Sequence, residues 1–265
     1  PGVLCKPQVQ KLCEEDYIEN VANWKDDENG QIDYSSIDLT LSDEGYEMVK
    51  GSVKPAGIEY RRTILENDYY AKKLNADNDG IFNLSKGKTY VFCLNEKLDK
   101  LRRTSIYGQA TAKSSIGRVD VLARLIVDKM FHYEYFDPEK LPERNVEMFL
   151  EISPITFNVR VKKAISLSQL RLFYGHPQDS QKQGKELCKS LLFHEEGPVV
   201  EDPMISVDLS ETQICSTGVS ASAFGAKEQE NPIDLWKHKS KEDRPDPVEY
   251  WEQLHVDERS RLSIK

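Results

Sequence analysis

The chain has 265 residues, and its formal net charge at pH 7 is −9. This acidic balance disfavours general nucleic-acid binding, which needs a basic face, but leaves room for a polyphosphate ligand in a locally positive cleft. Charged residues make up 31% of the chain and its mean hydropathy is −0.60, and no apolar run approaches the roughly 20 residues of a membrane span. We therefore expect neither a nucleic-acid nor a membrane partner.

The first half of the chain is predicted to contain one helix followed by short strands. Residues 7–20 have Pro7 in the first turn and loosely spaced apolar residues on one face, as in a helix. Residues 36–41 alternate apolar and polar side chains, which predicts a strand that the Ser42–Gly45 run ends. Further strands are predicted at residues 58–64, 80–84 and 89–94, with an exposed polar stretch at 66–79.

The second half continues with short strands separated by turn residues. Residues 105–112 are predicted to form a strand, whereas the period of 119–127 fits no element safely. Residues 128–145 are predicted to form a loop, in which the aromatic residues are expected to serve packing. Strands at 146–153, 156–161 and 167–174 and a helix at 181–193 complete the prediction. This pattern favours a mainly β fold, a barrel or jelly roll with a few short helices, over alternating β/α units.

The cysteines indicate the compartment and exclude one class of enzyme. The five of them are scattered, without a Cys-x-x-Cys pair, which is typical of free thiols in a reducing compartment. We therefore expect a cytoplasmic protein. The zinc-binding signature of cytidine-type deaminases, His-x-Glu followed by Pro-Cys-x-x-Cys, is missing from the sequence, which argues against that class.

Residues 111–118, Thr-Ala-Lys-Ser-Ser-Ile-Gly-Arg, concentrate the candidate binding chemistry. Lys113 and Arg118 supply two cations, the two serines supply hydroxyls, and Gly117 allows a tight turn. Such groups at a turn into a short helix suit a phosphate-bearing ligand. About thirty residues further on, Glu151 lies in an otherwise apolar strand and supplies acid–base capacity. Together the two features predict a nucleotide site with a proton shuttle.

Each of these residues also has a simpler structural explanation. Ser114 and Ser115 could cap a short helix. Arg118 and Glu151 could form a structural ion pair between strands. Gln169, in a late strand, could simply form hydrogen bonds with the backbone instead of a ligand. The histidines have no spacing that would join them as metal ligands.

Four stretches resemble the dCTP deaminase family of the deoxyuridine-triphosphatase-like (dUTPase-like) fold. Residues 35–41 resemble its early Ser-Val/Ile-Asp-Leu-Arg-Leu strand, and residues 113–118 resemble its Arg-Ser-Ser-Leu-Gly/Ala-Arg nucleotide motif. Leu150-Glu151 resembles the strand with the catalytic glutamate, and residues 167–170 resemble the late strand with Ile-Gly/Ala-Gln-Leu. The longer run 109–118 resembles the long, duplicated bacterial branch. The resemblance implies a mainly β, dUTPase-like distorted barrel or jelly roll.

The resemblance also implies hydrolytic deamination of dCTP to dUTP and ammonia, a step of deoxypyrimidine nucleotide metabolism. Glu151 would act as general base and then acid, without zinc, while Ser114 and Arg118 orient the water and the cytosine ring. Mg²⁺ would enter with the substrate triphosphate. The substrate-binding residues that the resemblance implies are Lys113, Ser115, Ile116, Gly117, Asp137, Phe149, Leu150 and Gln169.

Some positions depart from the family pattern. Asp137-Pro138 resembles the family's Asp-Pro-Gly-Trp/Phe loop, but Glu139-Lys140 follows and the distance to Glu151 is longer, which puts sugar selection by Asp137 in doubt. Lys113 stands where the family has Arg, so the charge is kept and the bidentate phosphate geometry is lost. The family's C-terminal lid has no clear counterpart in residues 174–189.

A four-residue echo suggests a second repeat. Residues 206–209, Ser-Val-Asp-Leu, repeat the pattern of residues 36–39, Ser-Ile-Asp-Leu. We expect residues 1–195 to form a dCTP-deaminase-like barrel domain, and 196–265 to begin an incomplete second repeat or to form a C-terminal extension. The chain is accordingly expected to be a fragment of a longer protein.

The resemblance further implies a homo-oligomer, commonly a trimer, with sites shared between subunits. Two alternatives to deamination stay open. One is a dUTP pyrophosphatase or a bifunctional enzyme, although the Gly-x-Asp-x-x-Tyr hairpin of that chemistry is not found. The other is a non-catalytic, nucleotide-binding copy of the fold.

Overall fold

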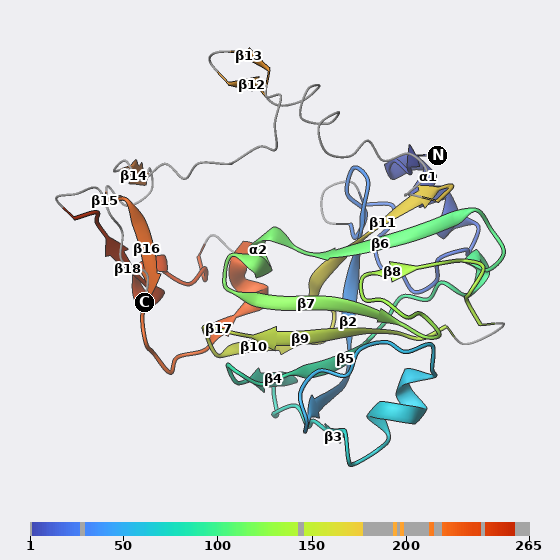
Figure 1. The fold of residues 1–265 in the computed structure, drawn as a ribbon, viewed down its shortest axis with the longest axis horizontal. Coiled ribbons are helices and arrows are strands. Elements are labelled where there is room, and N and C mark those ends of the chain that lie inside the picture. Colours follow the sequence, from blue (N-terminus) through green and yellow to red (C-terminus); the bar gives the residue numbers. More distant parts are fainter. Residues whose placement is uncertain are drawn as a thin grey trace. The chain divides into compact units, whose positions relative to one another are not determined.

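The computed structural model describes residues 2–26, 30–142, 146–176, 219–239 and 242–257, and the backbone of residues 193–194, 197–198 and 212–214 (Figure 1). The chain divides into two compact units, residues 1–180 with 230–244 and residues 181–229 with 245–265. Among the described helices, none combines the length and the apolar character that a membrane crossing requires.

Nine strands form the main sheet of the first unit. They are β1 (Gly2–Val3), β2 (Ile37–Met48), β3 (Ala71–Lys73), β5 (Tyr90–Leu94), β6 (Ile106–Ala112), β7 (Val121–Val127), β8 (Tyr135–Phe136), β9 (Met148–Pro154) and β11 (Ser166–Tyr174). The order is β7-β9-β5-β2-β11-β6-β8, with β1 paired to β11 and β3 to β2. All these pairings are antiparallel, and the sheet curves into a nearly closed barrel (Figure 1).

A smaller sheet joins residues far apart in the sequence. It consists of β4 (Ile81–Leu84), β10 (Val159–Lys162) and β17 (Ile233–Asp234), with β17 parallel to β10. Arg160 Nε lies 2.5 Å from a carboxylate oxygen of the buried Asp234. Lys162 Nζ lies 4.9 Å from the centre of the Trp236 ring. Through these contacts the segment 230–244 packs against β10 and belongs to the first unit.

The helices are short. They are α1 (Lys6–Glu14), a π-helical turn (Arg61–Leu65), a 3₁₀ turn (Asp99–Leu101), α2 (Ser114–Gly117), a second 3₁₀ turn (Leu235–Lys239) and α4 (Pro247–Tyr250).

In the second unit, strands β12 (Phe193–His194) and β13 (Gly197–Pro198) pair, as do β14 (Thr212–Ile214) and β15 (Val219–Ala221). Strands β16 (Ala223–Ala226) and β18 (Trp251–Leu254) form a third antiparallel pair.

Both faces of the central strands are buried, which explains their long apolar runs. Ile37, Leu39 and Leu41 of β2 lie on one face and are fully buried. On the other face, Tyr46 and Phe149 belong to a second apolar cluster, which also contains Tyr60, Ile64 and Leu65. Residues 53–71, which we call the covering segment, therefore lie over part of the sheet, including the face of β9 that bears Phe149.

The mainly β prediction is confirmed, and most strands lie where the sequence places them. Within residues 119–127, left unassigned, Val121–Val127 form β7. The predicted strand at 58–64 is wrong: this segment makes the π-helical turn, because Tyr60 and Ile64, four residues apart, both pack into the second cluster. The predicted helix over 7–20 ends at Glu14, and the polar stretch 66–79 contains β3.

The predicted end of the second strand at Ser42–Gly45 is also wrong. Strand β2 continues to Met48, with an irregular register between Leu41 and Gly45 opposite β5. A Cβ atom on Gly45 would lie 2.5 Å from the Phe92 ring, so the glycine allows a close approach rather than a turn. The echo at 206–209, and the predicted helix at 181–193 except for Phe193 in β12, lie outside the described residues.

Candidate active site

Glu151 lies on β9 between two strands that fix its position. It pairs with Arg124 of β7 on one side and with Val91 of β5 on the other. The residue is 1% exposed, and its side chain lies on the same face as Phe149, under the covering segment. A buried carboxylate is costly unless it is paired and hydrogen-bonded, so Glu151 requires partners for its carboxylate oxygens.

Two side chains hold the Glu151 carboxylate. Arg124 donates from Nε to Oε1 at 3.1 Å, and its Nη2 contacts the same oxygen. The Tyr133 hydroxyl donates to Oε2 at 3.0 Å. The Arg124 guanidinium also lies over the Tyr133 ring, 4.2 Å from its centre. Glu151, Arg124 and Tyr133 thus contact one another in all three combinations, and we call them the carboxylate triad.

The electrostatics of the triad keep both donors in their donating forms. Burial, and then the negative charge and hydrogen bond of Glu151, raise the pKa of Tyr133 well above its ordinary value. Burial lowers the pKa of Arg124, but the hydrogen bond to Glu151 and its charge outweigh this and raise that pKa overall. The phenol is therefore neutral and the guanidinium charged at neutral pH.

A second charged cluster lies around Glu147, four residues earlier and just before β9 begins. Arg61 donates from Nε to both oxygens of Glu147 at 2.9 Å, and from Nη1 to Glu44 at 2.5 Å. Its Nη2 lies 3.2 Å from the Cys93 sulfur, and burial raises the pKa of that thiol to about 12. This cluster ties the covering segment to β2 and β9.

The predicted phosphate-binding residues lie at the junction of β6 and β7, where Figure 1 shows α2. Ile116 is 1% exposed and anchors the turn, whereas Ser114 and Arg118 are exposed. The Lys113 backbone N–H donates to the Leu167 carbonyl at 3.0 Å. Its ammonium group forms an ion pair with Asp38 of β2. The sequence therefore presents exposed hydroxyl and cationic groups on a firmly held turn.

Gln169 lies next to this turn. It is paired with Asp38 of β2 on one side and with Thr111 of β6 on the other, and its Nε2 is 3.5 Å from the Thr111 hydroxyl. Lys113, Asp38 and Gln169 are thus brought together, although they are widely separated in the sequence. We call this group, with Ser114, Ser115 and Arg118, the α2 cluster.

The remaining predicted residues are placed differently. Asp137 is 7% exposed, and its carboxylate binds its own turn through the Glu139 backbone N–H at 3.0 Å and Lys140 at 3.2 Å. Phe149 and Leu150 are fully buried inside β9. Gly117, at the end of α2, has nothing within 4 Å of where a Cβ would lie.

The α2 cluster and the carboxylate triad are separate in the single chain. Arg124 lies opposite Glu151, whereas Arg118 precedes Val121, which pairs with Pro154 three residues further along β9. Three residues of strand span about 10 Å. Within the described ranges, no hydrogen bond or ion pair joins Glu151 to Ser114 or Arg118, and the cation that contacts Glu151 is Arg124.

Sequence reasoning missed three residues. Arg124 is the one charged residue in Val121–Val127, and that isolated charge was the available signal. Tyr133 was expected to serve packing, but it donates to Glu151. Asp38 was noted only as part of a strand motif, although it pairs with Lys113.

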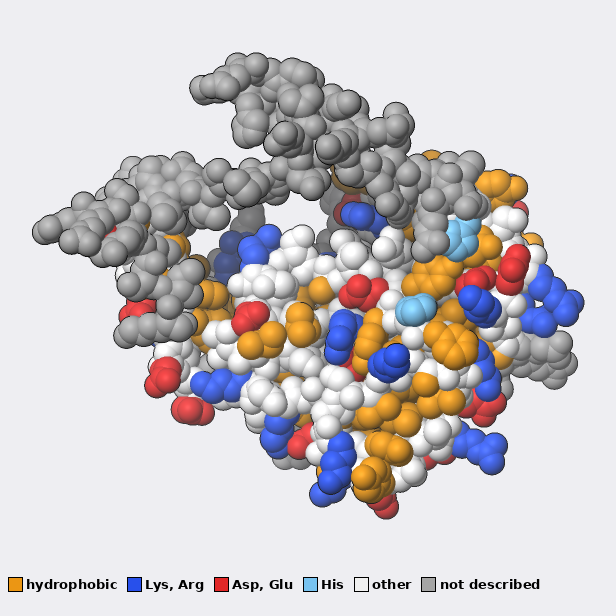
Figure 2. All heavy atoms as spheres, in the orientation of Figure 1, with side chains coloured by type: hydrophobic (Ala, Val, Ile, Leu, Met, Phe, Trp, Pro, Cys, Tyr) orange, Lys and Arg blue, Asp and Glu red, His pale blue; other side chains and the backbone are white. Residues whose placement is uncertain are grey.

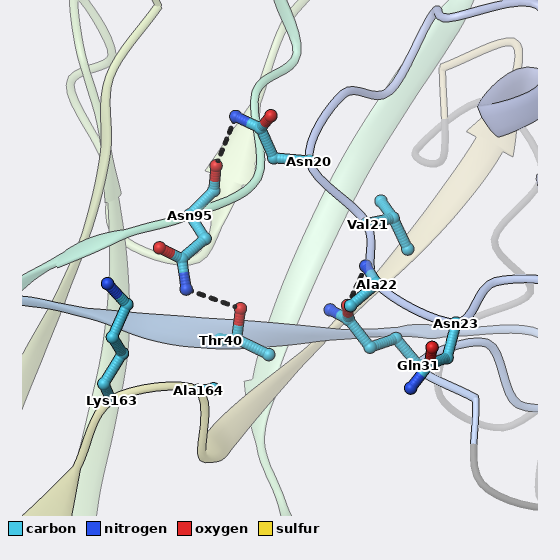
Figure 3. A pocket seen from close by; sticks show the side chains of 9 residues that line it. All are labelled: Asn20, Val21, Ala22, Asn23, Gln31, Thr40, Asn95, Lys163 and Ala164. Atoms are coloured by element: carbon cyan, nitrogen blue, oxygen red, sulfur yellow. Dashed lines mark hydrogen bonds between the residues drawn. The ribbon is translucent and has the colours of Figure 1, made fainter.

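A cavity of about 670 Å³ lies apart from these residues. Asn20, Gln31, Thr40, Asn95 and Lys163 are among the side chains that line it (Figure 3). Several of its amides hold the fold together, since Asn20 donates to the Asn95 carbonyl at 3.0 Å and Asn95 to the Thr40 hydroxyl at 3.0 Å. None of the predicted site residues lines this cavity.

Charge on the visible face is dispersed. In Figure 2 lysine and arginine side chains are scattered among acidic and hydrophobic ones rather than gathered in one basic patch. This agrees with the acidic composition. Any anion would therefore be bound by a few local groups, such as Lys113 and Arg118, and not by a broad positive surface.

Asp128, buried beside the covering segment, provides a stability test. It accepts the Tyr60 backbone N–H at 2.8 Å. Burial raises its pKa from 3.8 to about 6, against the lowering effect of the Tyr60 bond, and nearby Glu147 adds to the rise. Because the folded state binds the proton more tightly than the unfolded state, this group lowers stability as pH rises from about 4 through 6.

We expect Asp128→Asn to stabilise the protein at pH 7.5, since asparagine keeps the acceptor and removes the buried charge. The gain in unfolding free energy should be about 1–3 kcal/mol and should vanish near pH 3.5. Urea unfolding of both proteins across this pH range measures it. A variant less stable than the wild type at pH 7.5 would contradict the expectation.

Comparisons with known proteins show the family and the fold of the chain. Residues 1–176 match the family model described as the 2'-deoxycytidine 5'-triphosphate deaminase (DCD) N-terminal domain. The solved structure of 2'-deoxycytidine 5'-triphosphate deaminase from Agrobacterium tumefaciens is similar, with a TM-score of 0.73 and 21% identity, covering 97% of this chain and 69% of that chain. At that identity the likeness concerns the fold, and it confirms the dUTPase-like barrel. No curated protein sequence matches the chain.

Proposed function

Because the chain belongs to the dCTP deaminase family, whose N-terminal domain matches residues 1–176, we propose that it deaminates dCTP hydrolytically to dUTP and ammonia. The observation that carries the proposal is Glu151, a carboxylate that is 1% exposed and held by Arg124 and Tyr133. A glutamate so held is suited to accept a proton and return it.

In the proposed reaction, water attacks C4 of the cytosine ring. Glu151 takes one proton from that water and delivers it to the ring, so that the oxygen bonds to C4. The C4–N bond then breaks, and the amino group leaves as ammonia with the second water proton. Such proton transfer contributes typically about 10²–10⁴ in rate. In this proposal the carboxylate carries both transfers, and the reaction proceeds without zinc.

The α2 cluster would bind the nucleotide. Lys113 and Ser115 would contact phosphates, Ser114 and Arg118 would orient the water and the base, and Gln169 would contact the nucleotide. Asp38 holds the Lys113 ammonium group and so limits how far it can move. The described residues contain no group of three or more His, Cys, Asp or Glu side chains arranged for a metal. Mg²⁺ would enter with the substrate triphosphate.

The separation of the α2 cluster from the carboxylate triad supports an oligomer. We propose a homo-oligomer, a trimer by family resemblance, in which the triad of one copy faces the α2 cluster of another.

Cys5, Cys13 and Cys93 are free thiols, which supports a reducing compartment such as the cytoplasm.

The test is to incubate the protein with dCTP and Mg²⁺ and to measure ammonia and the nucleotide product. Ammonia and dUTP in equal amounts are expected. Formation of dUMP and pyrophosphate would instead indicate pyrophosphatase activity, alone or with deamination. Binding of dCTP without turnover by the assembled protein would leave a nucleotide-binding copy of the fold and would overturn the proposed reaction.

A further inference from the structure

We propose that Arg124 and Tyr133 are positioning residues for Glu151, which fix both of its carboxylate oxygens before the proton transfer, with Arg124 as the cation beside them. The inference deepens the proposed function and rests on it. It assigns a role to two residues that the sequence motifs leave aside, one on β7 and one in the turn that follows.

The geometry constrains the carboxylate on two sides. Arg124 contacts Oε1 through two nitrogens, and Tyr133 contacts Oε2. Oε1 accepts two hydrogen bonds, whereas Oε2 accepts one from Tyr133 and retains a further lone pair that can accept a proton. The stacking of the guanidinium on the Tyr133 ring links the two donors, so that a movement of one disturbs the other. Arg124 also lies 3.3 Å from the Ser52 hydroxyl, which limits its movement further.

Charged and titratable side chains face Glu151 from three neighbouring segments. Arg124 faces it from β7 and Tyr133 from the 128–134 turn, while Tyr60 faces it from the covering segment, where the charge of Glu151 contributes to raising the Tyr60 pKa. Glu134 lies close enough to Arg124 to influence its charge. Among these groups Arg124 is the single cation, so it is the group that favours the ionised carboxylate.

A purely structural role is the alternative. Buried ion pairs are weak evidence for stability, because the cost of desolvation offsets much of the attraction. The Arg61–Glu147 pair offers a direct comparison, since it also joins an arginine to a glutamate, here at the residue that precedes β9. Its side chains are 26% and 32% exposed, whereas Glu151 is 1% exposed. A positioning role predicts that the two arginines behave differently when each is replaced.

The experiment compares Arg124→Gln, Arg124→Lys and Tyr133→Phe with the matched control Arg61→Gln. For Arg124→Gln we expect kcat to fall by roughly 10²-fold, with KM for dCTP nearly unchanged. The acidic limb of its kcat/KM profile should move to higher pH, because the variant lacks the cation that contacts the carboxylate. Arg124→Lys should restore most of the pH profile. Tyr133→Phe should lower kcat by about tenfold, and Arg61→Gln should leave the profile in place.

A second readout does not depend on turnover. In protein labelled with ¹³C at glutamate side-chain carboxyls, the resonance missing from Glu151→Gln identifies Glu151. Arg124→Gln should move the titration midpoint of that resonance to higher pH, and Arg61→Gln should not. An unmoved midpoint in Arg124→Gln, or an equal movement in Arg61→Gln, would overturn the inference. If the wild type does not deaminate dCTP, the proposed function fails, while the titration still decides whether Arg124 controls the carboxylate.

Discussion

Replacement of Glu151 by glutamine is expected to lower kcat for dCTP deamination by about 10²–10⁴ or more, since the amide cannot take a proton from water. The amide has nearly the same shape as the carboxylate. Its oxygen can accept from Arg124 while its NH2 group donates to the Tyr133 hydroxyl, which can also accept, so the fold and dCTP affinity should change little. Single-turnover assays and dCTP binding measure the two effects separately. A variant that retains wild-type kcat would contradict the role of Glu151.

A mixing experiment tests whether the site spans two copies. Glu151→Gln and Arg118→Ala should each be inactive alone, because each lacks one part of the site. Co-assembled in equal amounts, they should recover up to about a quarter of the wild-type activity, since that share of sites would combine two intact parts. Arg118 is exposed, so its replacement should not unfold the chain. No recovery from mixed oligomers would contradict a shared site.

Gly108→Ala is expected to lower the free energy of unfolding more than any of the substitutions proposed above. Gly108 of β6 pairs with Phe136 of β8, and an added Cβ would lie 1.9 Å from the Phe136 ring. Phe136 is fully buried and cannot move aside without a shift of its backbone. Overpacking of this kind costs typically about 1–3 kcal/mol and occasionally more, and we expect at least about 3 kcal/mol from urea unfolding.

The matched control is Gly117→Ala. No atom lies within 4 Å of the added methyl group there, so the unfolding free energy should change by less than about 0.5 kcal/mol. Phe136 lies between Tyr133 and Asp137, so Gly108→Ala should also disturb the carboxylate triad and lower activity. Equal stability of the two glycine variants would show that the 133–137 turn adapts to the added methyl group.

Several strands could be predicted from the sequence because their chemistry is local. The apolar alternation of 36–41 and the turn residues around 80–84 and 89–94 reflect burial and backbone preferences that each segment carries itself. The misassigned segment 58–64 has apolar residues that fit either period, and only packing of Tyr60 and Ile64 against the sheet decides in favour of a turn. Gly45 was misread for a related reason, since the ring of Phe92 that it accommodates comes from another strand.

The sequence alone was enough to predict the mainly β class, which is confirmed, and to propose residues 113–118 as a nucleotide motif and Glu151 as the base, because each depends on residue types at short spacing. Only the tertiary structure decided what these residues contact. Asp38 and Lys113 meet because β2 and β6 flank β11, and Arg124 meets Glu151 because of the register between β7 and β9. Such pairings depend on how distant strands align, and the local sequence of one strand does not show which residues of another strand lie opposite it.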